Sequence, residues 1–82
     1  MIRHRAGRPT KVGDVVIIPL ERVSINTSGG SKGIRGYASL RPLGIAVLSP
    51  GGIIVLNETG EHTPVESWLE TIEGLREAIT GS

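Results

Sequence analysis

The chain has 82 residues and a mass of 8.7 kDa, with 12 glycines, one tryptophan, one tyrosine and neither cysteine nor phenylalanine. This length suits one domain, and so short a chain buries only about 60–68% of its unfolded surface, so self-association would supplement a small core. The lack of cysteine excludes a disulfide framework, a thiolate nucleophile and a cysteine metal site.

The net charge is +1, but the two halves of the chain carry opposite charge. Residues 1–41 contain eight lysines and arginines against two acidic residues, whereas residues 42–82 contain one arginine and six glutamates. A basic half is typical of proteins that bind nucleic acid or an anionic surface. We favour a simpler interpretation, in which one helix carries most of the acidic residues on its solvent face. Single-strand binding would favour several aromatic residues among the cations, and Tyr37 is the only one in the basic half.

Residues 1–12 are polar and basic and contain Gly7 and Pro9, which predicts a basic arm before the first strand. The charged start is not followed by an apolar segment, and the longest apolar runs are about a third of a membrane span. We therefore expect a cytoplasmic protein without membrane insertion, with a single domain over residues 13–80.

Three stretches after the arm have strand patterns. The β-branched run Val15–Ile18 predicts a strand that Pro19 ends, and residues 21–27 alternate between apolar and polar, as a half-exposed strand does. Residues 37–48 are extended, and Pro42 among them predicts a bulge or a sheet edge because it lacks an N–H. The turn signal Ser49-Pro50-Gly51-Gly52 makes residues 43–57 a predicted hairpin.

A glycine-rich segment, residues 28–36, separates the second strand from the third and predicts a mobile loop. Freed backbone N–H groups with nearby cations can hold an anion, so this loop is the candidate site for an anion, a nucleic acid or a protein partner. It is not a Walker loop, which runs into a helix rather than a strand. The candidate residues are Gly29, Gly30, Lys32, Gly33, Arg35 and Gly36.

The C-terminal residues predict one helix of about 16 residues. Thr63 stands at the N-cap, Pro64 at the first helical position and Glu66 three residues after the cap, which together form a capping box. Glutamates fall on the outward faces. An apolar stripe with helical spacing follows the cap; it consists of Val65, Trp68, Leu69, Ile72, Leu75 and Ile79.

These elements predict a β-rich α+β fold, an antiparallel sheet of about four to five strands with one C-terminal helix packed on it. The strands are apolar on both faces, but one helix covers only one face. An uncovered apolar face is rare in monomers, so we expect a homodimer. The candidate dimer or core anchors are Val16, Ile18, Ile45, Val47, Ile54, Leu56 and Trp68.

The chain offers little for catalysis or metal binding. Its only histidines are His4 and His62, its only aspartate is Asp14, and it has no G-x-S-x-G turn and no paired metal-ligand motif. We expect no catalytic residue, no metal, no cofactor and no enzymatic activity.

The order of the segments carries a resemblance. Residues 12–24 are similar to the pattern G-x-x-V-I-P-V-x-x-V-S, a glycine-rich segment follows, residues 40–47 are similar to R-P-V-A-x-x-V, and residues 52–56 to G-V-x-x-L. In this order, over roughly residues 7–80, the chain resembles the sporulation protein YtfJ (GerW) family. It differs by its short basic arm in place of an N-terminal helix and by its shorter glycine tract. The resemblance implies a non-enzymatic protein of a family linked to spore formation, without active-site residues to carry over.

We therefore expect a binding or structural module that acts as a homo-oligomeric protein-interaction domain with an unidentified protein partner. The alternative, with nucleic acid as the less favoured partner, is anion or nucleic-acid binding through the basic arm and the glycine-rich loop; a salt-sensitive affinity would distinguish it. The cations of that alternative are Arg3, Arg5, Arg8, Lys11, Lys32 and Arg35.

Overall fold

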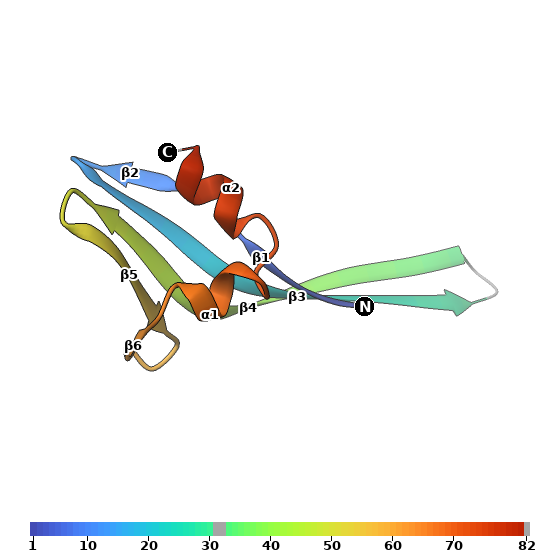
Figure 1. Ribbon diagram of the computed structural model, residues 1–82. Helices are drawn as coiled ribbons and strands as arrows, with labels where there is room; N and C mark the ends of the chain where they lie inside the picture. Colours follow the sequence, from blue (N-terminus) through green and yellow to red (C-terminus); the bar gives the residue numbers. More distant parts are fainter. Residues whose placement is uncertain (31–32, 82) are drawn as a thin grey trace.

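The computed structural model describes the backbone of residues 1–30 and 33–81, and the side chains of residues 1–25 and 39–81. Over these residues six strands form one antiparallel sheet, and two short helices follow (Figure 1). The predicted β-rich α+β class, with a helical C-terminal segment on an antiparallel sheet, is confirmed. The elements are β1 (Ile2–Ala6), β2 (Thr10–Val12), β3 (Val15–Gly30), β4 (Gly33–Ser49), β5 (Gly52–Asn57), β6 (His62–Thr63), α1 (Glu66–Leu69) and α2 (Leu75–Thr80).

The long strand β3 is the centre of the sheet. One side of β3 pairs with β4, and its other side pairs first with β2 and then with β1. Beyond β4 the sheet continues through β5 to the two-residue strand β6. The strand order is therefore β1-β3-β4-β5-β6, with β2 beside β3 in line with β1.

Most of residues 1–12 are strand, which corrects the prediction of an arm outside the sheet. Ile2 lies opposite Ser24 and Ala6 opposite Leu20, so β1 is an edge strand of the sheet. Its residues 2–5 are exposed, and charged, exposed side chains are typical of edge strands. The backbone therefore finds its partners through pairing with β3, a contact that the local composition does not reveal.

Pro19 does not end a strand, because β3 continues through it. The Pro19 carbonyl accepts a hydrogen bond from the Gly7 N–H at 2.7 Å, in the gap between β1 and β2. The proline nitrogen faces the same gap, where no ladder hydrogen bond is missing. A Cβ on Gly7 would lie 2.8 Å from the Pro19 ring, so glycine permits this close passage.

The described part of the glycine-rich segment is also strand, which corrects the prediction of a loop. Gly29 lies opposite Ile34 and Gly30 opposite Gly33, so the β3–β4 ladder extends to this point. A ladder that is already paired at its base can propagate through glycine, although glycine weakens a strand. Residues 31 and 32, and with them the candidate Lys32, lie outside the described residues.

The predictions for Pro42 and for the following hairpin are confirmed. Leu20 pairs with Gly44 and Glu21 with Pro42, which leaves Leu43 as the extra residue of a bulge. Pairing with β5 starts only at Gly44, so Pro42 also lies on a free edge of β4. At the other end the ladder closes with Ser49 opposite Gly52.

The predicted 16-residue helix is wrong, because the segment is broken into α1 and α2. Between them, the Glu73 N–H donates to the His4 carbonyl at 2.8 Å and the Glu73 carbonyl accepts from Ala6 at 2.9 Å. Residue 73 thus extends the sheet beyond β1. Gly74 then takes a left-handed conformation with φ 84° and starts α2, which glycine adopts without strain.

The predicted N-cap is also wrong. The first helix begins after Val65, which makes no side-chain cap bond. Thr63 Oγ1 instead donates to the Val55 carbonyl at 3.1 Å and accepts from Trp68 Nε1 at 2.7 Å. The threonine therefore fastens the Trp68 ring to the end of β5.

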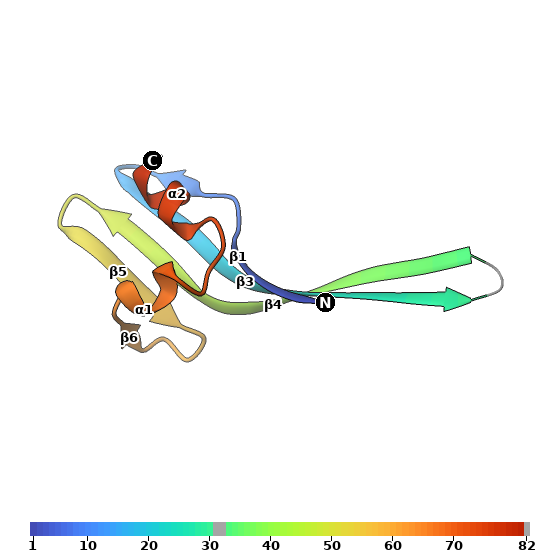
Figure 2. The same ribbon diagram turned by 45° about the vertical axis from the view of Figure 1, so that its right-hand side comes forward.

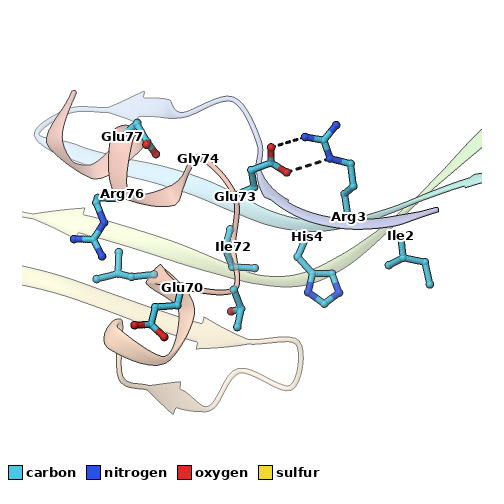
Figure 3. Close-up of a pocket in the computed structure, with 11 residues that line it drawn as sticks. Ile2, Arg3, His4, Glu70, Ile72, Glu73, Gly74, Arg76 and Glu77 are labelled. Carbon is cyan, nitrogen blue, oxygen red and sulfur yellow. Dashed lines mark hydrogen bonds and ion pairs between the residues drawn. The ribbon is translucent and has the colours of Figure 1, made fainter.

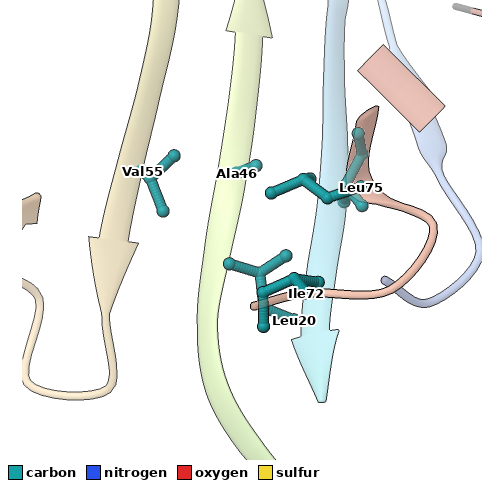
Figure 4. Packing of buried hydrophobic residues seen from close by; sticks show 6 residues of the cluster. Leu20, Ala46, Val55, Ile72 and Leu75 are labelled. Atoms are coloured by element: carbon teal, nitrogen blue, oxygen red, sulfur yellow. The ribbon is translucent and has the colours of Figure 1, made fainter. Parts of the chain in front are cut away.

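The core lies between one face of the sheet and the helical segment (Figure 4). Its sheet residues are Ile18, Leu20, Ala46 and Val55, and its helical-segment residues are Ile72 and Leu75. The predicted stripe does pack on the sheet, although the helix is broken: its other members, Val65, Trp68, Leu69 and Ile79, are half-buried against this core.

The molecule is elongated, with principal extents of 55 × 22 × 20 Å. Its radius of gyration is 15.2 Å, whereas a compact chain of this length has about 12 Å. The elongation comes from the β3–β4 hairpin, which continues past the end of β1 as a two-stranded ribbon (Figures 1 and 2). No helix within the described residues has the length and apolar character needed to span a membrane.

Candidate functional site

The face of the sheet opposite the helices, which we call the open face, has no cover in the described chain. Strand register aligns its residues in rows, because directly opposite residues in an antiparallel pair share a face. The first row is Thr10, Ile17, Val47 and Ile54, and the second is Pro19, Ile45, Leu56 and His62.

The two rows are apolar except for Thr10 and His62 at their ends, and they are partly exposed to solvent; the next row of this face carries the Arg5–Glu21 pair. No residue of the two rows belongs to the core cluster or packs against it, and α1 and α2 both lie over the other face (Figures 1 and 2). Ile54 is 41% exposed and Ile45 is 36% exposed. Neither row contains a lysine, an arginine or an acidic residue. The surface is therefore suited to contact with another apolar, uncharged surface.

The size of the open face limits what it can do alone. Four strands about 4.8 Å apart and six residues of about 3.3 Å each give a footprint of roughly 400 Å². The largest apolar patch on a typical monomer is about 300–600 Å², whereas a standard interface buries about 800 Å² on each partner. The open face is thus large enough for recognition and small enough that a dimer would depend on concentration.

The sequence-predicted anchors divide between the two faces. Ile18 is fully buried in the core, and Val16 and Trp68 pack against it. The open face holds the other four, which are Ile45, Val47, Ile54 and Leu56. Ile17 and Pro19 belong to the open face too and were missed, because Val15–Ile18 is apolar on both faces and its pattern does not tell which face the helices cover.

The glycine-rich candidates do not form a cradle for an anion in the described chain. Gly29 and Gly30 are in β3, while Gly33 and Gly36 are in β4. Arg35 occupies the register position opposite Ser28. Extended, paired strands point successive N–H groups to opposite edges, so these N–H groups do not converge on one point as they do in an anion-binding loop.

Two of the arm cations are engaged by carboxylates. Arg3 forms a two-pronged ion pair with Glu73, in which its Nε donates to Oε2 at 3.1 Å (Figure 3). The hydrogen bond to Glu73, followed by the charge of that carboxylate, raises the pKa of Arg3 above its ordinary value. Arg5 Nε lies 3.4 Å from Glu21 Oε2. These contacts fasten β1 to its neighbours and reduce the free positive charge of residues 1–12.

Another group of cations lies where the ribbon leaves the body. Arg22 of β3 is directly opposite Arg41 of β4, and His4 of β1 is directly opposite Arg22 on the other side. Neither arginine forms an ion pair with any residue whose side chain the structure describes. The Arg22 Nε is buried and has no hydrogen-bond partner there. We call Arg22 and Arg41 the cation row, and the exposed His4 side chain flanks it.

A shallow hollow of about 410 Å³ lies between β1 and the helical segment (Figure 3). Its polar lining residues include Arg3, His4, Glu70, Glu73 and Arg76. Glu73 is held by Arg3, and the described residues contain no group of three or more His, Cys, Asp or Glu side chains that could hold a metal ion. The hydroxyl that lines the hollow, Thr71 Oγ1, donates to the Ser67 and Trp68 carbonyls at 3.3 and 3.4 Å.

Comparison of the chain with protein-family models, with curated proteins and with solved structures gave no match in any of the three.

Proposed function

We propose that this protein is a non-enzymatic interaction module that forms a homodimer through its open face. The observation that carries the proposal is the pair of apolar, uncharged rows that stay half-exposed on the face opposite the helices. The resemblance of the segment order to the YtfJ (GerW) family agrees with a module of this kind and is the basis for proposing that family.

A second copy of the chain is the occupant that this surface favours. Two sheet faces can pack against each other about 10 Å apart with their strands nearly aligned, as in a β-sandwich, where their contacting rows carry no charged side chain. A two-fold interface uses the same patch on both subunits, so the patch must be compatible with itself. The open face meets this condition because neither row places like charges against each other.

Anion binding through residues 1–12 and the glycine-rich segment has less support. Arg3 and Arg5 have carboxylate partners, and the described glycines are paired in strands.

The test compares two neighbouring isoleucines of β5. Ile53 and Ile54 are both 41% exposed, but they point to opposite faces of the sheet. Light scattering after size exclusion should give the wild type and Ile53→Lys a mass approaching twice 8.7 kDa at high concentration. Ile54→Lys should stay near the mass of one chain, because its ammonium would be buried in the interface.

Circular dichroism is the control that checks whether both variants keep the β-rich fold. A wild-type mass of one chain at every concentration would contradict the proposal. Equal dimerisation of the two folded variants would place the interface elsewhere and would contradict it as well.

A further inference from the structure

We propose that the cation row binds the phosphate backbone of nucleic acid, with the β3–β4 ribbon lying along the duplex. The inference is independent of the dimer, because the cation row continues the helix-covered side of the sheet and not the open face. It rests on charge, on an unsatisfied side chain and on the shape of the ribbon.

The cation row places two positive charges directly opposite each other. Like charges directly opposite each other in a sheet are destabilising, yet Arg22 and Arg41 face each other without a carboxylate partner among the described side chains. The neighbouring acid, Glu21, points to the other face and contacts Arg5. Glu73 is held by Arg3. An anion supplied by a ligand would remove this repulsion.

The Arg22 side chain has a hydrogen-bond donor without a partner among the described residues. Its Nε is buried without a partner, and a buried polar group of this kind calls for an explanation. The guanidinium provides donors in a fixed fork that matches phosphate oxygens. Arg41 and His4 are exposed on either side of it. The three side chains together span three adjacent strands of one face.

The ribbon brings no acidic residue to the cation row after Glu21. The glutamates beside His4, among them Glu70 and Glu73, come from the helical segment that lines the hollow. From residue 22 to residue 57 the sequence contains Arg22, Lys32, Arg35 and Arg41 and no aspartate or glutamate. On the same face, the next row along the ribbon contains Ser24 of β3 and, directly opposite it, Ser39 of β4. Serine hydroxyls and arginines are common donors to phosphate and sugar oxygens.

The shape of the β3–β4 ribbon favours nucleic acid over an anionic membrane as the partner. Beyond the end of β1 the described hairpin has only two strands, and the major groove of B-DNA is about 12 Å wide and admits a two-stranded ribbon. An amphipathic membrane-surface element presents a broad apolar face beside its cations. Beside the arginine pair this face of the sheet has Ser24 and Ser39, and Ile2 of β1 is the one apolar residue of that row.

The experiment measures fluorescence anisotropy of a labelled 20-base-pair DNA duplex with the full chain, in 50 mM and 200 mM salt. We compare the wild type with the Arg22→Gln/Arg41→Gln double variant. The matched control is the Arg8→Gln/Lys11→Gln double variant, which removes the same amount of charge. Both positions are exposed; Arg8 lies between β1 and β2, and Lys11 lies in β2. Circular dichroism checks that both variants fold.

We expect wild-type binding in 50 mM salt that weakens steeply at 200 mM, because phosphate contacts release counterions. The cation-row variant should lose at least about tenfold in affinity and about two units of salt slope, one for each phosphate contact removed. The control should lose less than about threefold. Absence of wild-type binding at 50 mM salt, or equal losses in both variants, would overturn the proposal.

Phosphatidylserine vesicles and heparin serve as competing polyanions. Cation-row-dependent binding to vesicles with no binding to the duplex would identify a membrane surface and overturn the nucleic-acid assignment. Displacement of bound duplex by heparin, with vesicles ineffective, would support it.

Discussion

At the scale of single residues, the cation row is the clearest conflict in the fold. Arg22 and Arg41 face each other on neighbouring strands, and the Arg22 Nε lacks a hydrogen-bond partner among the described residues. Proteins usually avoid like charges at directly opposite positions of a sheet. Such a conflict is expected where a residue serves binding and not stability.

Removing one charge of this pair should therefore stabilise the free protein. We expect Arg41→Gln to raise the free energy of unfolding by about 0.2–1 kcal/mol, the range for interactions between side chains that face each other on neighbouring strands. Urea unfolding followed by circular dichroism in low salt measures the change. Arg76→Gln on α2 is the control, and it should stay within about 0.5 kcal/mol of the wild type. A clear loss of stability in Arg41→Gln would show that the guanidinium stabilises the fold.

At the scale of elements, the break between α1 and α2 is decided by two competing sets of hydrogen bonds. A continuous helix would satisfy residues 70–75 internally, whereas the structure gives the Glu73 backbone to His4 and Ala6 of β1. The edge of β1 gains partners in this way, and Gly74 allows the chain to turn into α2. Glycine in the middle of the predicted helix is the signal that could have indicated the break.

Gly74→Ala tests this break by the sign of its effect. With φ at 84°, alanine would be strained by about 1–2 kcal/mol, so we expect the free energy of unfolding to fall. In a continuous helix the same change would raise it by about 1 kcal/mol. Urea unfolding distinguishes the two cases, with the exposed helical Glu77→Ala as a near-neutral reference. A stabilised Gly74→Ala variant would contradict the broken segment.

At the scale of the whole molecule, the sheet has two different faces and an extension. One face is covered by α1 and α2, the other is open and apolar, and the β3–β4 ribbon gives the chain its 55 Å length. A two-stranded ribbon is marginally stable by itself. Both proposals concern surfaces of this sheet, and they use opposite sides of it.

The open face also predicts how stability depends on concentration. If the folded chains pair, association stabilises the folded state by mass action, and the melting temperature rises with protein concentration. We expect this rise for the wild type and Ile53→Lys, but not for Ile54→Lys. Differential scanning calorimetry at several concentrations measures it. A wild-type melting temperature independent of concentration would argue against the dimer.

Local patterns in the sequence were sufficient for several features of the fold. The Ser49–Gly52 turn, the hairpin around it and the bulge at Pro42 follow from the dihedral limits and the missing N–H of proline and from the freedom of glycine. The exposed glutamates and the buried stripe of residues 65–79 follow from amphipathic spacing. The spacing indicated which side chains pack, and it did so correctly even though the backbone is not one helix.

Part of the candidate site was equally accessible from the sequence. Counting apolar faces against a single covering segment predicted that one sheet face lacks a cover. Ile45, Val47, Ile54 and Leu56 were among the seven predicted dimer or core anchors, but the count did not assign them to a face. The cation row was not accessible, because Arg22 and Arg41 are 19 positions apart in sequence and meet only through the register set by the bulge.

What the sequence alone determined about this protein is the set of features that depend on neighbours within a few residues: strands, tight turns, the apolar stripe and an apolar excess that one helix cannot cover. Only the tertiary structure decided that residues 2–6 and 10–12 join the sheet, that residue 73 pairs with β1 and which face of β3 is buried. The physical reason is that these features arise from backbone pairing between distant segments, and almost every residue carries the same N–H and C=O groups for that pairing.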